Sequence, residues 1–226
     1  RLVLVVDASE SMGFGSLDSI DSPGDEWTKY DHAIAIAATM AYMGTRQGDS
    51  VGLAIFDQVV SRYFKPSSQP GTWRQLVTEL AAVPRWNQTS IGKVLEQVTG
   101  KLTGRSVVVV LSDFFDDLDA IQKGLRMLRH KGHEVLACQI LDPQEIRFPF
   151  EDVTMFEGLE EAGELLTEPR ALREAYIQQM ADHTDELAHK CRRMGIDFER
   201  FDSGEPLDVA ISTFLARRAD RLRLTS

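Results

Sequence analysis

Two apolar runs that each lead into an aspartate constrain what this chain can fold into. Residues 2–6 are Val and Leu and stop at Asp7, and residues 107–111 are again Val and Leu, followed by Ser112 and Asp113. Such runs are typical of parallel strands that are buried on both faces. Because parallel strands end together at one edge of a sheet, where α/β proteins bind ligands, we expect Asp7 and Asp113 to meet there.

Three hydroxyl residues accompany the two aspartates. Ser9 and Ser11 alternate after Asp7, and Thr89 stands where a helix is expected to begin. Hydroxyl and carboxylate oxygens suit a hard divalent cation, Mg²⁺ first and Mn²⁺ or Ca²⁺ after it. We therefore predict a metal site made of Asp7, Ser9, Ser11, Thr89 and Asp113. The alternative is that the three hydroxyls only cap helices and close turns.

The rest of the chain alternates between strand and helix patterns, which favours a doubly wound, mostly parallel α/β sheet flanked by helices, with a C-terminal extension of a hairpin and a long helix. Strands are expected at 2–7, 51–56, 59–64, 107–111, 134–140 and 196–201. Helices are expected at 28–46, 72–82, 89–102, 117–129, 170–194 and 207–219. Residues 12–27 are expected to form a loop, and 153–157 with 164–167 a short hairpin.

A length of 226 residues predicts one domain, 1–226. We divide it into a core with the metal site at 1–142, a hairpin insertion at 143–169, and the long helix, last strand and last helix at 170–226. The net charge of −10 disfavours nonspecific binding to nucleic acid. No apolar run is long enough for a transmembrane helix. Cys138 and Cys191 are expected as buried thiols, which favours a cytoplasmic location.

The five predicted metal ligands resemble the metal-ion-dependent adhesion site of von Willebrand factor A domains. The order D-x-S-x-S, then Thr, then a strand-end Asp matches at every position. A wider likeness, to the bacterial domain-of-unknown-function family 58, rests on segments spread over nearly the whole chain: 30–56, 111–114, 142–145, 148–150 and 191–197. Two places depart from the usual pattern, namely Glu10 between the serines and residues 86–88 before the threonine.

Three neutral hydroxyls and two carboxylates leave a bound cation able to attract another anion. The resemblance implies that a partner protein supplies an Asp or Glu to the metal, so that the domain is a non-enzymatic, Mg²⁺-dependent interaction module. It further implies a MoxR-type AAA+ ATPase as the partner, in complex assembly or maturation, and a membrane-anchoring segment upstream of this chain.

The alternative function is a metal-dependent hydrolase acting on a phosphoester-like anion, with the metal as Lewis acid. None of the five histidines is expected near the site as a general base, and no phosphate-binding glycine loop is found. Two interpretations stay open for Asp116 and Asp117: Asp116 caps the next helix while Asp117 meets its dipole, or they serve a metal. Trp86 is either a partner-facing aromatic residue or a buried one.

Overall fold

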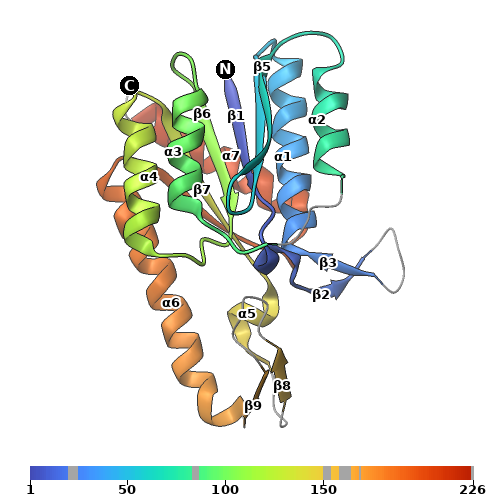
Figure 1. Cartoon of the computed structure of the whole chain (residues 1–226), viewed down its shortest axis with the longest axis vertical. Coiled ribbons are helices and arrows are strands. Elements are labelled where there is room, and N and C mark those ends of the chain that lie inside the picture. The colour runs from blue at the N-terminus through green and yellow to red at the C-terminus, as the bar shows by residue number, and fades with distance from the viewer. Residues whose placement is uncertain (20–24, 83–86, 150–153, 158–163, 168, 225–226) are drawn as a thin grey trace.

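The computed structural model describes residues 1–19, 25–82, 87–149, 154–157, 164–167 and 169–224 (Figure 1). Its centre is a six-stranded sheet in the order β10-β7-β6-β1-β4-β5. These strands are β1 (Leu2–Asp7), β4 (Val51–Phe56), β5 (Val60–Ser67), β6 (Val107–Ser112), β7 (Glu134–Leu141) and β10 (Asp197–Asp202). All neighbours are parallel except β5, which is antiparallel to β4. The predicted mostly parallel α/β sheet is therefore confirmed.

Helices cover both faces of the sheet, and the alternating side chains of each strand supply both cores. Leu4 and Val6 of β1 belong to one buried cluster, whereas Val3 and Val5 belong to the other. The first cluster includes residues of α1 (Lys29–Arg46), α2 (Thr72–Leu80) and α7 (Leu207–Leu224), and the second those of α3 (Ile91–Lys101), α4 (Leu118–His130) and α6 (Pro169–Arg193). Burial on both faces explains why the central strands are nearly continuous runs of Val and Leu.

Several short elements gather beyond the carboxyl edge of the sheet (Figure 1). They are a 3₁₀ helix (Glu10–Gly13), β2 (Gly15–Asp18), β3 (Glu26–Thr28), α5 (Pro143–Arg147), β8 (Thr154–Glu157) and β9 (Glu164–Thr167). The expectation of a loop through 12–27 was wrong, because β2 and β3 form an antiparallel ribbon. The sequence of the ribbon lacks the apolar alternation that would predict a strand. Gly15 lets the two backbones approach closely, because a Cβ at this position would collide with the Trp27 carbonyl.

Helix α6 extends beyond the carboxyl edge of the sheet (Figure 1). Its C-terminal part packs on the core through Leu187 and Cys191, which are fully buried, whereas Ala175 near its start is exposed. The helix expected at 170–194 therefore packs on the core over only part of its length. Within the described ranges, no helix combines the length and the hydropathy needed to cross a membrane. Trp86 and Val153, to which the sequence analysis gave roles, lie outside these ranges.

Gly92 of α3 tests the contact between α3 and α4. A Cβ on Gly92 would lie 2.8 Å from the Ala120 carbonyl oxygen, whereas a Cβ on Gly100 of the same helix would meet nothing within 4 Å. We expect Gly92→Ala to lower the free energy of unfolding by about 1–3 kcal/mol, because neighbouring backbone must shift. Gly100→Ala should raise it by about 0.5–1 kcal/mol. Urea unfolding followed by circular dichroism measures both, and equal effects would contradict this packing.

Candidate functional site

Asp7 is the last residue of β1 and is completely buried. Its Oδ1 accepts a hydrogen bond from the Ser9 backbone N–H at 2.9 Å, and its Oδ2 accepts one from the Ser112 hydroxyl at 2.6 Å. Ser112 ends β6, the parallel neighbour of β1. The carboxylate is therefore fixed between the ends of two strands, at the edge where the strand pattern predicted it.

The hydroxyls of the D-x-S-x-S motif lie next to each other. Ser9 is buried, and its Oγ is 3.3 Å from the Oγ of Ser11. The chain enters the 3₁₀ helix at Glu10, and Met12 anchors this helix in the core with no exposed surface. This tight turn after β1 brings two neutral hydroxyls to the strand end that carries Asp7.

Thr89 lies in the loop before α3 and not in the helix itself, which begins at Ile91. This corrects the expected helix start, since Ser90 is the N-cap residue. The backbone N–H of Glu10 donates to the Asn87 carbonyl at 2.8 Å. The loop that carries Thr89 therefore runs against the loop that carries the D-x-S-x-S motif, which we call the motif loop. The Oγ1 of Thr89 is buried and has no hydrogen-bond partner among the residues that the structure describes. Buried hydroxyls are normally satisfied, so this one is a candidate for binding a ligand.

Asp113 follows β6 and is also completely buried. Its Oδ1 accepts from the Phe115 backbone N–H at 3.1 Å. Phe114 between them has φ of 58°, an unusual value for a bulky residue. The Ser112 hydroxyl accepts from the Phe114 N–H, and His183 Nε2 lies 3.0 Å from the Phe114 carbonyl oxygen. Strained backbone held this firmly is a common feature of functional sites.

Lys29 was missed by the sequence analysis. It is the first residue of α1, after the N-cap Thr28, and its side chain has no exposed surface. Its Nζ donates to Asp113 Oδ2 at 2.8 Å and to Glu145 Oε1 at 2.6 Å, and it lies 4.9 Å from the centre of the Phe115 ring. Burial opposes the charge on Lys29, but the two carboxylates outweigh it and raise the pKa of the ammonium.

Asp142 and Glu145 connect this ion pair to the surrounding elements. They form a capping box at the start of α5, in which Glu145 Oε2 accepts from the Asp142 N–H. The buried Asp142 carboxylate also accepts from the backbone N–H and the hydroxyl of Ser16 on β2, which follows the motif loop. The D-x-x-E sequence after β7 therefore fastens both the motif loop and Lys29.

Two sequence signals pointed toward these residues. Asp142 follows the buried strand β7, so it had to reach the same edge as Asp7 and Asp113. Lys29 lies in the first turn of a helix, where the helix dipole disfavours a cation, so a buried counter-charge was to be expected. Neither signal identifies which carboxylates meet the ammonium, because the residues come from distant parts of the chain.

The structure corrects the capping roles of Asp116 and Asp117. Asp117, not Asp116, is the N-cap of α4, and its carboxylate accepts from the Ala120 N–H at 2.7 Å. Asp116 Oδ2 instead accepts from the N–H of Ile91, the first residue of α3, at 2.9 Å. Asp116 thus ties the loop after β6 to the helix that follows Thr89.

The electrostatics of Asp7 fit a site that takes a cation. Burial, and next the nearby Asp113 carboxylate, raise the pKa of Asp7 to about 7, against hydrogen bonds from Ser112 and Ser9 that lower it. Carboxylate and hydroxyl oxygens are the donors that Mg²⁺ or Mn²⁺ prefers, and the Thr89 hydroxyl has no partner among the described residues. Ser9, Ser11, Thr89, Asp7 and Asp113 would hold the ion, which would supply a positive charge at this edge of the sheet.

Other features of the described ranges have different chemistry. The described ranges contain no group of three or more His, Cys, Asp or Glu residues able to hold a metal ion.

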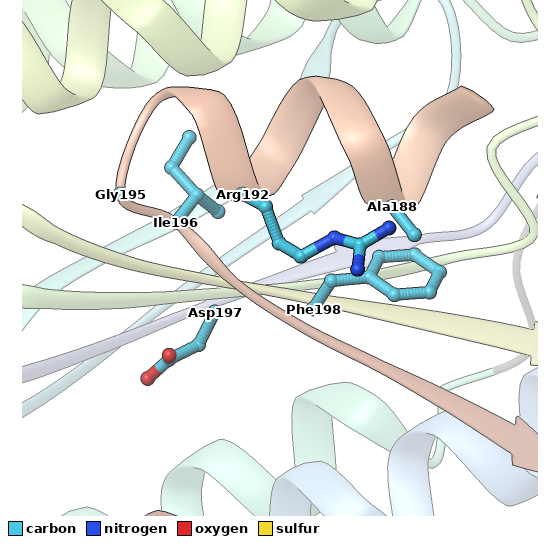
Figure 2. Close-up of a pocket in the computed structure, with 6 residues that line it drawn as sticks. All are labelled: Ala188, Arg192, Gly195, Ile196, Asp197 and Phe198. Atoms are coloured by element: carbon cyan, nitrogen blue, oxygen red, sulfur yellow. The ribbon is translucent and has the colours of Figure 1, made fainter. Parts of the chain in front are cut away.

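A cavity of about 560 Å³ lies between the end of α6 and the start of β10, at the amino edge of the sheet, away from Asp7 and Asp113. Figure 2 shows Arg192 beside Phe198 there, while Asp197 points away from Arg192. Asp197 instead pairs with Arg218 of α7 at 2.8 Å.

The fold and this polar edge define an α/β protein with an open, mostly parallel sheet and a buried carboxylate–hydroxyl cluster where its strands end. The family model described as "Protein of unknown function DUF58" matches residues 1–186. The chain therefore belongs to the DUF58 family.

Curated relatives of this chain carry no assigned activity. Uncharacterised proteins of Mycobacterium tuberculosis and Mycobacterium bovis are each 25% identical over 201 residues, which is 85% of this chain and 59% of theirs. The chain thus spans about three-fifths of the length of these curated relatives.

Two solved structures share the fold at 16% identity. The conserved hypothetical protein BatB from Bacteroides thetaiotaomicron has a TM-score of 0.59 and covers 97% of this chain and 98% of its own. An aerotolerance-related membrane protein from Bacteroides fragilis has a TM-score of 0.52, with 93% and 96% covered.

Asp7 predicts an unusual pH dependence of stability in EDTA. Its ordinary pKa is 3.8, and the folded value is about 7, so between these values the folded protein keeps a proton that the unfolded chain releases. Raising the pH through this window therefore lowers the free energy of unfolding, by a few kcal/mol as an order of magnitude, and below about pH 4 the effect is absent.

Urea unfolding of Asp7→Asn and wild type at pH 5 to 8 measures this contribution. Asp7→Asn should lose less stability than wild type as the pH rises. Asp49→Asn, at the amino edge of the sheet, serves as the control and should follow wild type. Identical pH profiles for Asp7→Asn and wild type would contradict the raised pKa.

Proposed function

We propose that this domain is a Mg²⁺-dependent protein-interaction module of the von Willebrand factor A type, and not an enzyme. The metal would be held by Asp7, Ser9, Ser11, Thr89 and Asp113. A partner protein would complete its coordination with an Asp or Glu. The observation that carries the proposal is the buried Thr89 hydroxyl, which lacks a partner within the described ranges and lies in the loop that runs against the motif loop.

The kind of donor supports binding to an anion more than hydrolysis. Three of the five donors are neutral, so the ion would keep much of its charge for a carboxylate from outside. Beside this cluster, a cavity of about 340 Å³ is lined by Phe115, Tyr176, Gln179, Met180 and His183. Such a hollow offers room for partner residues that flank the acidic one.

We also propose a class of partner protein and a location in the cell. Resemblance to family 58 supports a MoxR-type AAA+ ATPase and a role in complex assembly or maturation. We also propose a cytoplasmic domain that works beside a membrane, anchored by a segment upstream of this chain. The aerotolerance-related membrane protein among the structural neighbours is in line with a membrane setting.

Thr89→Val tests the ligand role without changing the shape of the side chain. Removing an unsatisfied hydroxyl should raise the free energy of unfolding in EDTA by about 1 kcal/mol. The same change should weaken Mg²⁺ binding by about tenfold or more, measured by isothermal titration calorimetry, because a ligand is lost.

Thr99→Val is the control for this test. Thr99 lies on α3 and is also buried, but its hydroxyl already donates to the Leu95 carbonyl at 2.6 Å. This variant should bind Mg²⁺ like wild type. A Thr89→Val protein that is less stable and binds Mg²⁺ normally would show that Thr89 has a structural role.

Partner capture tests the metal bridge itself. The wild-type domain should retain a purified MoxR-type AAA+ ATPase in the presence of Mg²⁺, because the ion would bridge the two proteins. EDTA and Asp7→Ala should each abolish retention, since both remove the bridging ion. Asp49→Ala, the same change at the opposite edge of the sheet, should retain the partner. Retention that survives EDTA and Asp7→Ala would refute a metal bridge.

A further inference from the structure

The ammonium of Lys29 already occupies one face of a proposed metal ligand. Its Nζ lies 2.8 Å from Asp113 Oδ2, and the other carboxylate oxygen accepts from the Phe115 N–H. Both oxygens of Asp113 are therefore engaged before any metal arrives. A divalent cation that uses Asp113 has to share this carboxylate with a buried positive charge.

Burying the Lys29 ammonium costs free energy, and its contacts with the two carboxylates offset this cost. Its side chain has no exposed surface, and it lies in the first turn of α1, where the helix dipole opposes a cation. Removing an ammonium from water costs several kcal/mol unless partners replace the hydration. Asp113 and Glu145 are these partners, at 2.8 and 2.6 Å.

Glu145 is a second ion-pair partner for the Lys29 ammonium. Its carboxylate binds Lys29 through Oε1 and the Asp142 N–H through Oε2, so it is fixed at the start of α5. If Asp113 turned to a metal, Lys29 would keep a charged partner. Glu145 therefore makes the Lys29–Asp113 ion pair exchangeable.

We propose that Lys29 sets the cation affinity of this site, by acting as an internal counter-ion that competes with Mg²⁺ for Asp113 and is received by Glu145 when Mg²⁺ binds. Lys29 and Glu145 are positioning residues here, because they act through Asp113. This inference rests on the proposed function, since it concerns the same metal site. It implies weak binding of Mg²⁺ by the isolated domain and tighter binding once a partner adds its carboxylate.

The position of α5 would then influence the metal. Phe148, the C-cap residue of α5, packs against Tyr176 of α6 with ring centres 4.5 Å apart and the rings tilted by 35°, and Arg173 donates to the Arg147 carbonyl at 3.4 Å. A partner that moves α6 would move Glu145 with α5. Cation affinity and contacts at α6 are coupled in this arrangement through the Glu145–Lys29 ion pair.

Calorimetric titration with Mg²⁺ alone, on four folded proteins, tests the inference. Lys29→Met with Glu145→Gln leaves the net charge of the chain at −10 but frees Asp113, so Mg²⁺ should bind about tenfold more tightly. Glu145→Gln alone leaves Lys29 with only Asp113, so binding should weaken by about tenfold. Lys123→Met with Glu96→Gln, an exposed pair 2.8 Å apart on α4 and α3, should match wild type.

The outcomes separate the inference from the proposed function. If wild type binds Mg²⁺ and the Lys29→Met/Glu145→Gln protein binds no more tightly, the counter-ion role is wrong and the metal site stands. If neither protein binds, both ideas fail. Binding by the double variant alone would support both, with the wild-type affinity below detection. Glu145→Gln keeps the Lys29–Asp113 pair, so this arm remains informative even if the double variant does not fold.

Discussion

The proximity of two buried carboxylates, Asp7 and Asp113, is the constraint on which the rest of this edge depends. Each is delivered by a strand that the core fixes on both faces, so neither can move away from the other. Burial, together with their mutual repulsion, raises the pKa of Asp7. Ser112 and the ammonium of Lys29 partly relieve it. An arrangement of this kind is stabilised by any cation that reaches it.

A network of polar contacts carries this constraint into the neighbouring elements. Lys29 links the start of α1 to Asp113 and Glu145, and Asp142 links the start of α5 to Ser16 on β2. Four segments far apart in the sequence thus meet at one edge. Removing one member of such a buried network leaves others unpaired, so the network resists partial change.

The sheet could be predicted from the sequence because burial on both faces imposes long Val and Leu runs. The same pattern predicts that Asp7 and Asp113 lie at one edge of the sheet. Lys29 and Glu145 could not be paired in this way, since their contact depends on how α1 and α5 sit over the sheet. The β2–β3 ribbon was missed for a similar reason: contacts such as Ser16 with Asp142 hold it, and not its own sequence pattern.

The chain belongs to the DUF58 family, whose function is unknown. The residues at the carboxyl edge of its sheet nevertheless have a definite chemistry. Oxygen donors converge there, and the buried Thr89 hydroxyl lacks a partner among the described residues. Next to Asp113, Phe114 has a positive φ, which is strained for a bulky residue. An unpartnered buried hydroxyl and a strained backbone are unfavourable for stability alone, and a bound ion would satisfy the hydroxyl.

Diffraction from crystals soaked in Mn²⁺, recorded for anomalous scattering, would show directly whether this edge of the sheet binds a cation. We expect one strong anomalous peak bounded by the hydroxyl oxygens of Ser9, Ser11 and Thr89, with Asp7 and Asp113 behind them. A peak elsewhere, or no peak while the Thr89 hydroxyl stays unpartnered, would contradict it.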